Sequence, residues 1–298
     1  MSAAPFDGFL LIDKPSQWTS HDVVAKVRAV TGQRKVGHAG TLDPMATGLL
    51  VLGLGRATRL LRFVQAGVKE YVARVMFGVA TDSLDADGAV LSRAPMPFGP
   101  EDLEQVMERF VGTVLQEPPM VSARKVEGRR LYELAREGEV VAREARPVEI
   151  HALELEDFAP SDYPEAILRV RCGTGTYVRT LADDIARALG GRAHLTALRR
   201  TRNGSLRVED AGTMDAFTTA GEINWLPLLL SPADGLADLP LEVVGPDAAI
   251  AVANGVSLTG SALRSDVTGL LRIVDANGRL LAVYQSDGVA ARAEVVLA

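Results

Sequence analysis

The sequence predicts an α+β fold, because segments with strand and helix periodicity alternate along most of the chain and short strands dominate its end. With 298 residues the chain is long enough to bury a sizeable core and to form two domains. The pattern changes at about residue 239. We therefore expect a larger domain over residues 1–238 and a small β-rich domain over residues 239–298.

The first elements are predicted from apolar runs and their boundaries. Residues 9–12 form a short apolar run that ends at an Asp-Lys-Pro turn, which is typical of a strand. A helix should follow, since Thr19 or Ser20 can cap its start, valines recur at helical spacing, and Gly32 can end it.

The later elements follow from the same signals. Compact or alternating apolar runs predict strands, and apolar residues every three or four positions predict helices. The expected strands are residues 49–54, 71–77, 166–172, 270–274, 280–284 and 293–297. The expected helices are residues 56–64, 100–112, 176–189 and 246–254, with a shorter helical piece at 131–136.

Residues 35–48, K-V-G-H-A-G-T-L-D-P-M-A-T-G, place one carboxylate, Asp43, in a predicted loop. The glycines and Pro44 disfavour a regular helix or strand, and Pro44 also restricts the backbone of Asp43. His38 and Asp43 are the side chains of this loop suited to ligand binding, proton transfer or covalent chemistry. The alternative is a solvated Asp-Pro turn without a function.

The composition excludes several classes of protein. No apolar run approaches the roughly 20 residues that span a bilayer, and the N-terminus lacks the pattern of a signal peptide, so we expect a cytoplasmic protein. The single cysteine, Cys172, cannot form an internal disulfide. One Cys and four His give no cluster with zinc-ligand spacing, and no metal site is expected.

The charge is unevenly distributed along the chain, although the net charge is −6. Residues 28–74 carry eight Lys or Arg against two acidic residues, and residues 192–207 carry five Arg and no acidic residue. Acidic residues gather at 144–165. One basic and one acidic face, or separate solvated surfaces, are equally compatible with this pattern.

Several motifs together resemble the TruB family of tRNA pseudouridine synthases. The resemblance covers most of residues 8 to about 235. It rests on the Asp43 loop and on K-E-Y (69–71), T-D-S-L-D-A-D-G (81–88), P-P-M-V-S-A-R-K-V-E-G-R-R-L-Y-E-L-A-R-E-G (118–138), C-G-T-G-T-Y-V-R-T-L-A-D-D-I (172–185) and A-H-L-T-A-L-R-R-T (193–201).

The resemblance implies a specific architecture. The catalytic domain should contain a mixed, mostly antiparallel sheet flanked by helices, and the C-terminal domain should be PUA-like. A mobile, basic, thumb-like insertion is expected at about residues 118–146. The C-terminal 59 residues carry four basic against six acidic residues, which departs from a basic RNA-binding surface.

The resemblance also assigns roles to individual residues. It implies that Asp43 is the catalytic residue, that Arg179 is its partner, and that Tyr71 lies in the active site. Asp43 could attack the ring, attack the sugar or take a proton, and the sequence leaves these routes open. Alternatively, Arg179 pairs with Asp183 on a helix surface, and Tyr71 is a core residue.

Further residues are implied to bind the substrate. His38 corresponds to a histidine that stacks in the space left by a flipped base, and Leu198 to an apolar residue of the pocket. Binding should rest on RNA shape and phosphates. The candidate contacts for this are Lys14, Arg124, Arg199, Arg200 and Arg202.

The expected function is isomerisation of uridine to pseudouridine at position 55 in the T loop of tRNA, without a cofactor. A monomer without an obligatory protein partner is the default expectation. The alternatives are an RNA-binding protein that refolds tRNA, a carboxylate glycosidase using Asp82, Asp85 or Asp87 as a second acid, and a guide-RNA-dependent relative.

Overall fold

The computed structural model describes residues 6–119, 125–126, 129–130, 143–219, 225–259 and 267–297. The chain divides into two units: unit 1 is Met1–Pro44, Gly48–Gly67 and Asn203–Ala298, and unit 2 is Met45–Thr47 and Val68–Arg202. The predicted boundary between residues 238 and 239 lies inside unit 1, and the predicted division into two domains stays a prediction.

The central strand of the first sheet in unit 1 is β1 (Gly8–Lys14), which is almost entirely buried because its apolar run has neighbours on both sides. It pairs antiparallel with β3 (Thr47–Leu54), with Ile12 opposite Leu50. It also pairs with β14 (Gly212–Thr213), in parallel, and with β15 (Leu229–Leu230). The strand predicted at residues 9–12 is confirmed.

One expectation for the Asp43 segment is wrong. The glycines do not prevent a strand throughout it, because Val36–His38 forms β2 and pairs antiparallel with β3. Gly37 lies opposite Gly53, and a Cβ on either residue would come within 3.0 Å of Leu61 side-chain atoms. The glycines thus permit close packing of the strand pair against Leu61.

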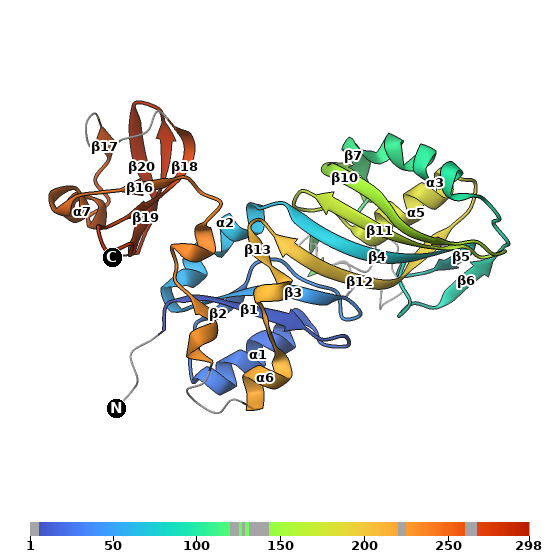
Figure 1. Ribbon diagram of the computed structural model, residues 1–298, viewed down its shortest axis with the longest axis horizontal. Coiled ribbons are helices and arrows are strands. Elements are labelled where there is room, and N and C mark those ends of the chain that lie inside the picture. The colour runs from blue at the N-terminus through green and yellow to red at the C-terminus, as the bar shows by residue number, and fades with distance from the viewer. Residues whose placement is uncertain are drawn as a thin grey trace. The chain divides into compact units, whose positions relative to one another are not determined.

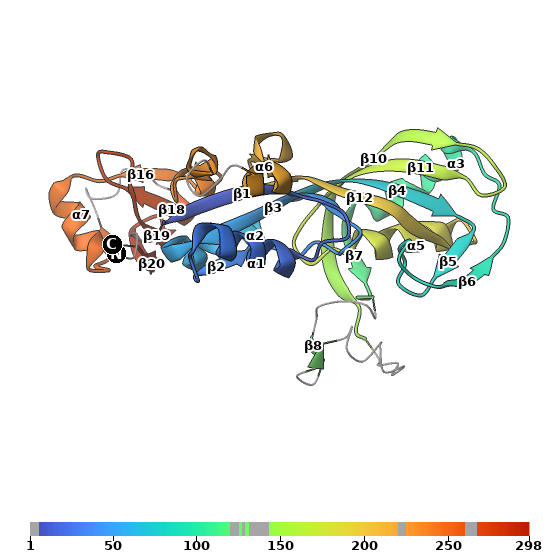
Figure 2. The same ribbon diagram turned by 90° about the horizontal axis from the view of Figure 1, so that it is seen from below.

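Helix α1 (Ser20–Thr31) follows β1 and is confirmed with its predicted ends. Thr19 caps its first turn by accepting a hydrogen bond from the Asp22 amide, and Asp22 reciprocates toward Thr19. Gly32 ends it in the left-handed conformation, with φ 65°. Figure 2 shows α1 and α6 (Met214–Thr219) on opposite sides of the β1–β3 layer.

The C-terminal part of unit 1 contains a second sheet with the strand order β16-β18-β19-β20-β17. Its strands are β16 (Leu241–Val243), β17 (Leu258–Thr259), β18 (Thr268–Val274), β19 (Leu280–Asp287) and β20 (Ala290–Val296), and its helix is α7 (Pro246–Ala253). The strands and the helix predicted for this region are confirmed. This sheet is labelled in Figure 1.

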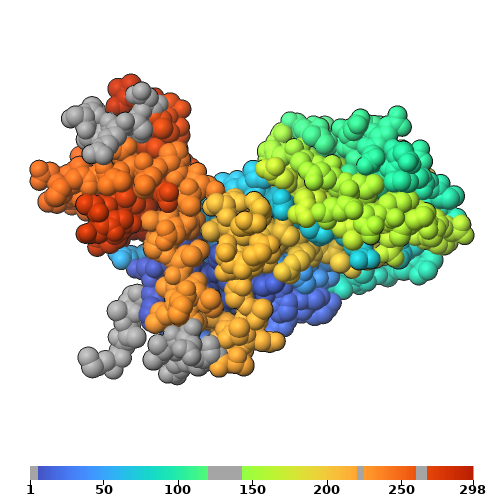
Figure 3. Space-filling view, viewed as in Figure 1, coloured from blue at the N-terminus to red at the C-terminus, as the bar shows by residue number. Residues whose placement is uncertain are grey.

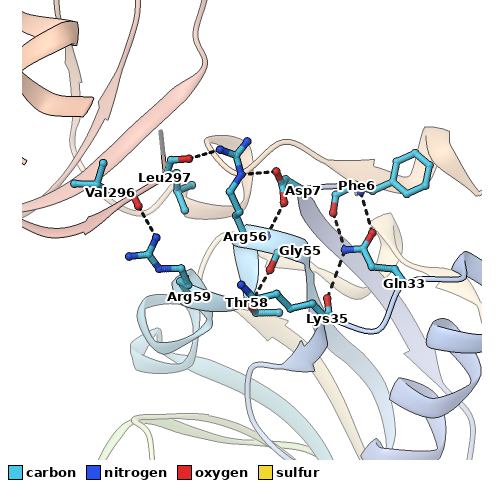
Figure 4. Close-up of polar contacts among 10 residues, drawn as sticks. All are labelled: Phe6, Asp7, Gln33, Lys35, Gly55, Arg56, Thr58, Arg59, Val296 and Leu297. Atoms are coloured by element: carbon cyan, nitrogen blue, oxygen red, sulfur yellow. Dashed lines mark hydrogen bonds and ion pairs between the residues drawn. The ribbon is translucent and has the colours of Figure 1, made fainter. Parts of the chain in front are cut away.

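A shared core and a set of arginines attach this second sheet to η1 (Gly55–Leu60) and α2 (Leu61–Ala66). Leu60 and Val64 belong to the same apolar cluster as Val283, Val295 and Leu297. At its rim Arg56 donates to the Leu297 carbonyl, and Arg59 donates to the Val296 carbonyl at 2.6 Å (Figure 4).

The remaining short elements of unit 1 connect these parts. They are β13 (Leu206–Arg207), η3 (Val208–Asp210), η4 (Leu226–Leu228) and η5 (Asp234–Leu236). The helix predicted at residues 56–64 is present only in part as an α-helix, because η1 is a 3₁₀ helix.

Unit 2 contains a sheet with the strand order β12-β4-β11-β10-β7. Its strands are β4 (Lys69–Phe77), β7 (Gly112–Gln116), β10 (Arg146–Ala159), β11 (Glu165–Cys172) and β12 (Ala193–Asn203). Helices α3 (Pro100–Met107), which continues into η2 (Glu108–Phe110), and α5 (Val178–Ala188) contact each other, and they contact β10 and β4 respectively (Figure 1).

Two hairpins complete the described part of unit 2. β5 (Val79–Thr81) pairs with β6 (Val90–Arg93), and β8 (Lys125–Val126) pairs with β9 (Arg129–Arg130). The second hairpin lies within the predicted thumb-like insertion, most of which, including the helical piece at 131–136, lies outside the described residues.

The acidic stretch at residues 144–165 lies largely on β10 and its connection to β11. In Figure 3, which is coloured by residue number, this part of the chain covers one continuous yellow-green area of the surface. Part of its charge is neutralised locally, since Arg169 contacts both Glu156 and Glu70. The predicted α+β class with a mixed, mostly antiparallel arrangement is confirmed: among the pairings described between strands, β1–β14 and β16–β18 are parallel.

Candidate active site

Asp43 lies in the irregular segment between β2 and β3 and is half-buried. Apolar neighbours anchor this segment, since Ala39, Leu42 and Ala46 are buried and the Ala39 amide donates to the Val51 carbonyl at 2.9 Å. The carboxylate is therefore carried by a loop whose small and apolar residues fix it to the core.

Lys14 lies beneath this loop and is 0% exposed. Its Nζ donates to the carbonyls of Pro15 at 2.9 Å, Trp18 at 2.6 Å and Pro44 at 3.2 Å. The ammonium thus links the turn after β1 to the residue that follows Asp43. Its predicted contact with RNA stays a prediction.

His38 ends β2, five positions before Asp43, and its ring is half-buried. The ring packs edge-on against that of His21 in α1, with 5.6 Å between centroids and an angle of 79° between the planes. This T-shaped arrangement is a favourable geometry for two aromatic rings. It limits the orientations that the His38 ring can adopt.

Arg179, in the first turn of α5, is 3% exposed. Its Nη1 donates to Asp85 Oδ2 at 3.1 Å and to the Ser83 carbonyl at 3.2 Å. The alternative of a surface arginine pairing with Asp183 is wrong, because Arg179 is buried and Asp183 forms ion pairs with Arg187 and Arg192.

Asp85 is held in a tight turn between β5 and β6. Its Oδ1 accepts hydrogen bonds from Ser83 Oγ at 2.5 Å and from the Asp87 amide at 3.2 Å. The Thr81 hydroxyl donates to the Asp85 carbonyl at 2.8 Å. The sequence predicts Asp85 only as an alternative acid and does not predict that it is the anion beside Arg179. The T-D-S-L-D-A-D-G motif was the available signal for it.

Tyr71 and Leu198 lie on β4 and β12 of unit 2, with Tyr71 half-buried and Leu198 buried. Lys69 precedes Tyr71 by two positions and therefore lies on the same face of β4. Burial, together with the nearby charge of Arg200, lowers the pKa of Lys69 to about 8. Burial raises the pKa of the neighbouring Cys172 thiol to about 11.

The arginines predicted to contact phosphates have different environments. Arg200 is buried, Arg199 is half-buried with its Nη1 3.5 Å from Thr47 Oγ1, and Arg202 is exposed with its Nε 3.8 Å from Glu70 Oε1. Arg124 lies outside the described residues. The phosphate contacts of all four stay predictions.

The candidate residues are divided between the two units. Unit 1 carries Asp43, His38 and Lys14, and unit 2 carries Tyr71, Arg179, Leu198, Arg199, Arg200 and Arg202. Within the described ranges no group of three or more His, Cys, Asp or Glu side chains could hold a metal ion. No helix of the described chain is both long and apolar enough to cross a membrane.

Comparisons with known proteins identify the family. Residues 28–178 match the model of the TruB family pseudouridylate synthase N-terminal domain, and residues 179–235 match that of the tRNA pseudouridylate synthase B C-terminal domain. A tRNA pseudouridine synthase B from Moorella thermoacetica is 43% identical over 286 residues, which cover 94% of each chain. Another from Thermobifida fusca is 42% identical over 298 residues, covering 98% of this chain and 99% of the relative.

Solved structures agree with this assignment. A crystal structure of a Cbf5-Nop10-Gar1 complex contains a chain that matches with a TM-score of 0.74 and 26% identity, covering 97% of this chain and 84% of that chain. The sequence match extends over nearly the whole length of the two relatives. The chain therefore belongs to the TruB family of pseudouridylate synthases, and it is an isomerase that forms pseudouridine in tRNA.

Proposed function

We propose that the enzyme converts uridine 55 in the T loop of tRNA to pseudouridine, with Asp43 as the catalytic residue. The observation that carries this proposal is the position of Asp43: a half-buried carboxylate in an anchored loop whose sequence matches the family motif. The reaction breaks the bond from C1′ to N1 and joins C1′ to C5 of the same uracil. C5 loses its proton and N1 gains one, so the reaction is redox-neutral. The residues must stabilise an intermediate while the base turns and allow this proton to leave C5.

The target base is stacked inside the T loop and must leave the stack to reach a pocket. Extrusion costs a few kcal/mol of lost stacking. We propose that the ring of His38 occupies the vacated space, because a planar side chain fixed at one orientation can stack on the neighbouring bases. The contact with His21 supports this role, since it restrains the ring before RNA binds.

The proposal also gives roles to Arg179, Tyr71 and Leu198, which the family resemblance implies. Arg179 would favour the ionised form of a carboxylate beside it, and its buried bond to Asp85 fixes its guanidinium group in advance. Tyr71 would offer a ring to stack on uracil, and Leu198 would exclude water from the intermediate. The route taken by Asp43 stays open among ring attack, sugar attack and proton abstraction.

The test is to incubate the protein with an unmodified tRNA transcript and map pseudouridine by carbodiimide labelling and primer extension. Wild type should give one new stop at uridine 55, and Asp43→Asn should give none. Asp210→Asn, which changes an exposed carboxylate elsewhere in unit 1, serves as the matched control and should retain activity.

Other outcomes distinguish the alternatives. Tight tRNA binding with no stop from the wild type would favour an RNA-binding protein that refolds tRNA. Release of free uracil would indicate a hydrolase rather than an isomerase. A stop at another position would overturn the T-loop assignment but preserve the chemistry.

A further inference from the structure

The two residues that flank Asp43 are both bound to the segment that runs from the end of β1 to the first turn of α1. On one side, Ser20 Oγ accepts a hydrogen bond from the Leu42 amide at 2.9 Å and lies 3.3 Å from the Leu42 carbonyl, to which it donates. On the other side, the Pro44 carbonyl accepts from the Gln17 amide at 2.8 Å and from Lys14 Nζ at 3.2 Å.

The Ser20 contact is buried and pre-formed. Ser20 is 1% exposed, and Leu42 is also buried. Ser20 is the first residue of α1, and the capping box of Thr19 and Asp22 fixes the helix start on which it lies. A hydroxyl can donate and accept at once, so one small side chain satisfies both backbone groups of Leu42. In an irregular loop no neighbouring strand supplies such bonds.

Among Ser20, Gln17 and Lys14, which bind the two residues flanking Asp43, Ser20 is the one whose substitution should disturb the fewest other contacts. Gln17 acts through its backbone, so its contact does not depend on its side chain. Lys14 also binds the carbonyls of Pro15 and Trp18, so its removal would disturb the turn as well as the loop. The hydrogen bonds of Ser20 Oγ, by contrast, both go to Leu42, directly beside Asp43.

We propose that Ser20 is a positioning residue for the reaction: its hydroxyl holds the backbone of Leu42 and thereby fixes the carboxylate of Asp43 in its reactive orientation. This inference rests on the proposed role of Asp43. A reactive group displaced by about 1 Å can lose on the order of 100-fold in rate. Loss of the hydroxyl should therefore slow the chemical step and leave RNA binding largely unchanged.

The test compares Ser20→Ala with Thr31→Val. Both variants remove a hydroxyl of α1 that bonds to the backbone, but Thr31 Oγ1 donates to the Val27 carbonyl at 2.7 Å, at the opposite end of the helix. Single-turnover rates, tRNA dissociation constants and melting temperatures are measured for each. Ser20→Ala should reduce the single-turnover rate by about 10- to 100-fold. Its dissociation constant should change less than about twofold, and Thr31→Val should retain the wild-type rate.

Three results would overturn the proposal. The first is a wild-type rate in Ser20→Ala. The second is an equal loss of rate in Ser20→Ala and Thr31→Val when both variants show the same fall in melting temperature. The loss of rate would then reflect lower stability and not a misplaced Asp43. The third is weakened tRNA binding that accounts for the whole effect of Ser20→Ala.

A measurement on the wild type keeps the proposal testable if Ser20→Ala does not fold. Hydrogen exchange should show that the Leu42 amide is protected in the free protein. Exchange at the rate of an unstructured peptide would show that Ser20 does not hold the Leu42 backbone. The failure of the proposed function looks different: the wild type would then make no pseudouridine, while the Leu42 amide could still be protected.

Discussion

Arg179 and Asp85 form a buried ion pair, with 3.1 Å between Arg179 Nη1 and Asp85 Oδ2. The pair joins the first turn of α5 to the turn between β5 and β6. Removing one partner of a buried ion pair costs about 3–5 kcal/mol, because the attraction that offsets the burial of both charges is lost. Asp85 therefore helps to hold Arg179 in place and to stabilise its buried charge.

We expect Asp85→Asn to lower the single-turnover rate by at least about 100-fold, because Arg179 would lose the anion that fixes it. The variant should also unfold at lower denaturant concentration. Asp87→Asn is the matched control, since Asp87 is exposed and lies in the same turn. Rates are measured with tRNA transcript in single turnover, and stability by urea unfolding. Equal rates in the two variants would show that the pair has no part in the reaction.

The ring of His38, rather than its proton, should matter for activity. We expect His38→Phe to retain most of the wild-type rate and His38→Ala to lose about tenfold or more, because only the former keeps a planar ring against His21. The measurement is single-turnover formation of pseudouridine at several pH values. If His38→Phe is as slow as His38→Ala, stacking is not the function of this residue.

The sequence predicts best those elements whose ends are set by residues close to them in the chain. The start and end of α1 were predictable because Thr19 and Gly32 are cap residues whose effect is confined to neighbouring positions. No strand was predicted at β10 or β12. In β10 the alternation of apolar and charged residues is interrupted by register shifts between Ile150 and Ala152 and between Leu155 and Asp157. In β12 the charged Arg200 lies in the interior, which departs from the apolar-in pattern of a strand.

The motifs name candidate residues for the site but not the contacts that these residues make. Asp43, His38, Tyr71 and Arg179 were named from motifs, but the bond from Arg179 to Asp85 joins residues 94 positions apart. Ser20 and Leu42 are separated by 22 positions, and Ser20 was predicted only as a helix cap. Contacts of this kind depend on strand pairing and on helix placement, which the motifs do not encode.

Stability should depend on the ionisation of Asp184 in α5. Burial, reinforced by the charge of Asp183, raises the pKa of Asp184 to about 6. Between pH 4 and 6 the native state holds a proton that the unfolded state has lost. The contribution of Asp184 to the free energy of unfolding therefore falls as the pH rises across this range to about 6. Asp184→Asn should thus increase the free energy of unfolding at pH 7 by about 1–3 kcal/mol and have little effect near pH 4.

Urea unfolding across this pH range tests the dependence on Asp184. Asp210→Asn, at an exposed position, is the control and should show no gain that depends on pH in this way. A constant difference between Asp184→Asn and wild type from pH 4 to 7 would contradict the prediction.

The arginines that bind β20 should hold the C-terminal sheet to η1 and α2. Arg56 also contacts Asp7, through its amide and its Nε at 2.6 Å from Asp7 Oδ2, so the N-terminal segment, η1 and the Leu297 carbonyl meet at one side chain (Figure 4). Arg62 adds an ion pair with Glu294 at 2.8 Å. Both guanidinium groups are more than half exposed, so each contact should contribute only about 0.5–1 kcal/mol.

We expect the triple variant of Arg56, Arg59 and Arg62 to Ala to loosen β20 without unfolding the protein, because the apolar cluster around Leu60, Val64 and Val295 remains. Amides of residues 290–297 should exchange faster with solvent, and proteases should cut the C-terminal region sooner. Arg279→Ala, which removes an exposed ion pair with Asp275 inside the same sheet region, should leave both measurements unchanged. Unaltered exchange in the triple variant would show that the apolar cluster alone holds this sheet in place.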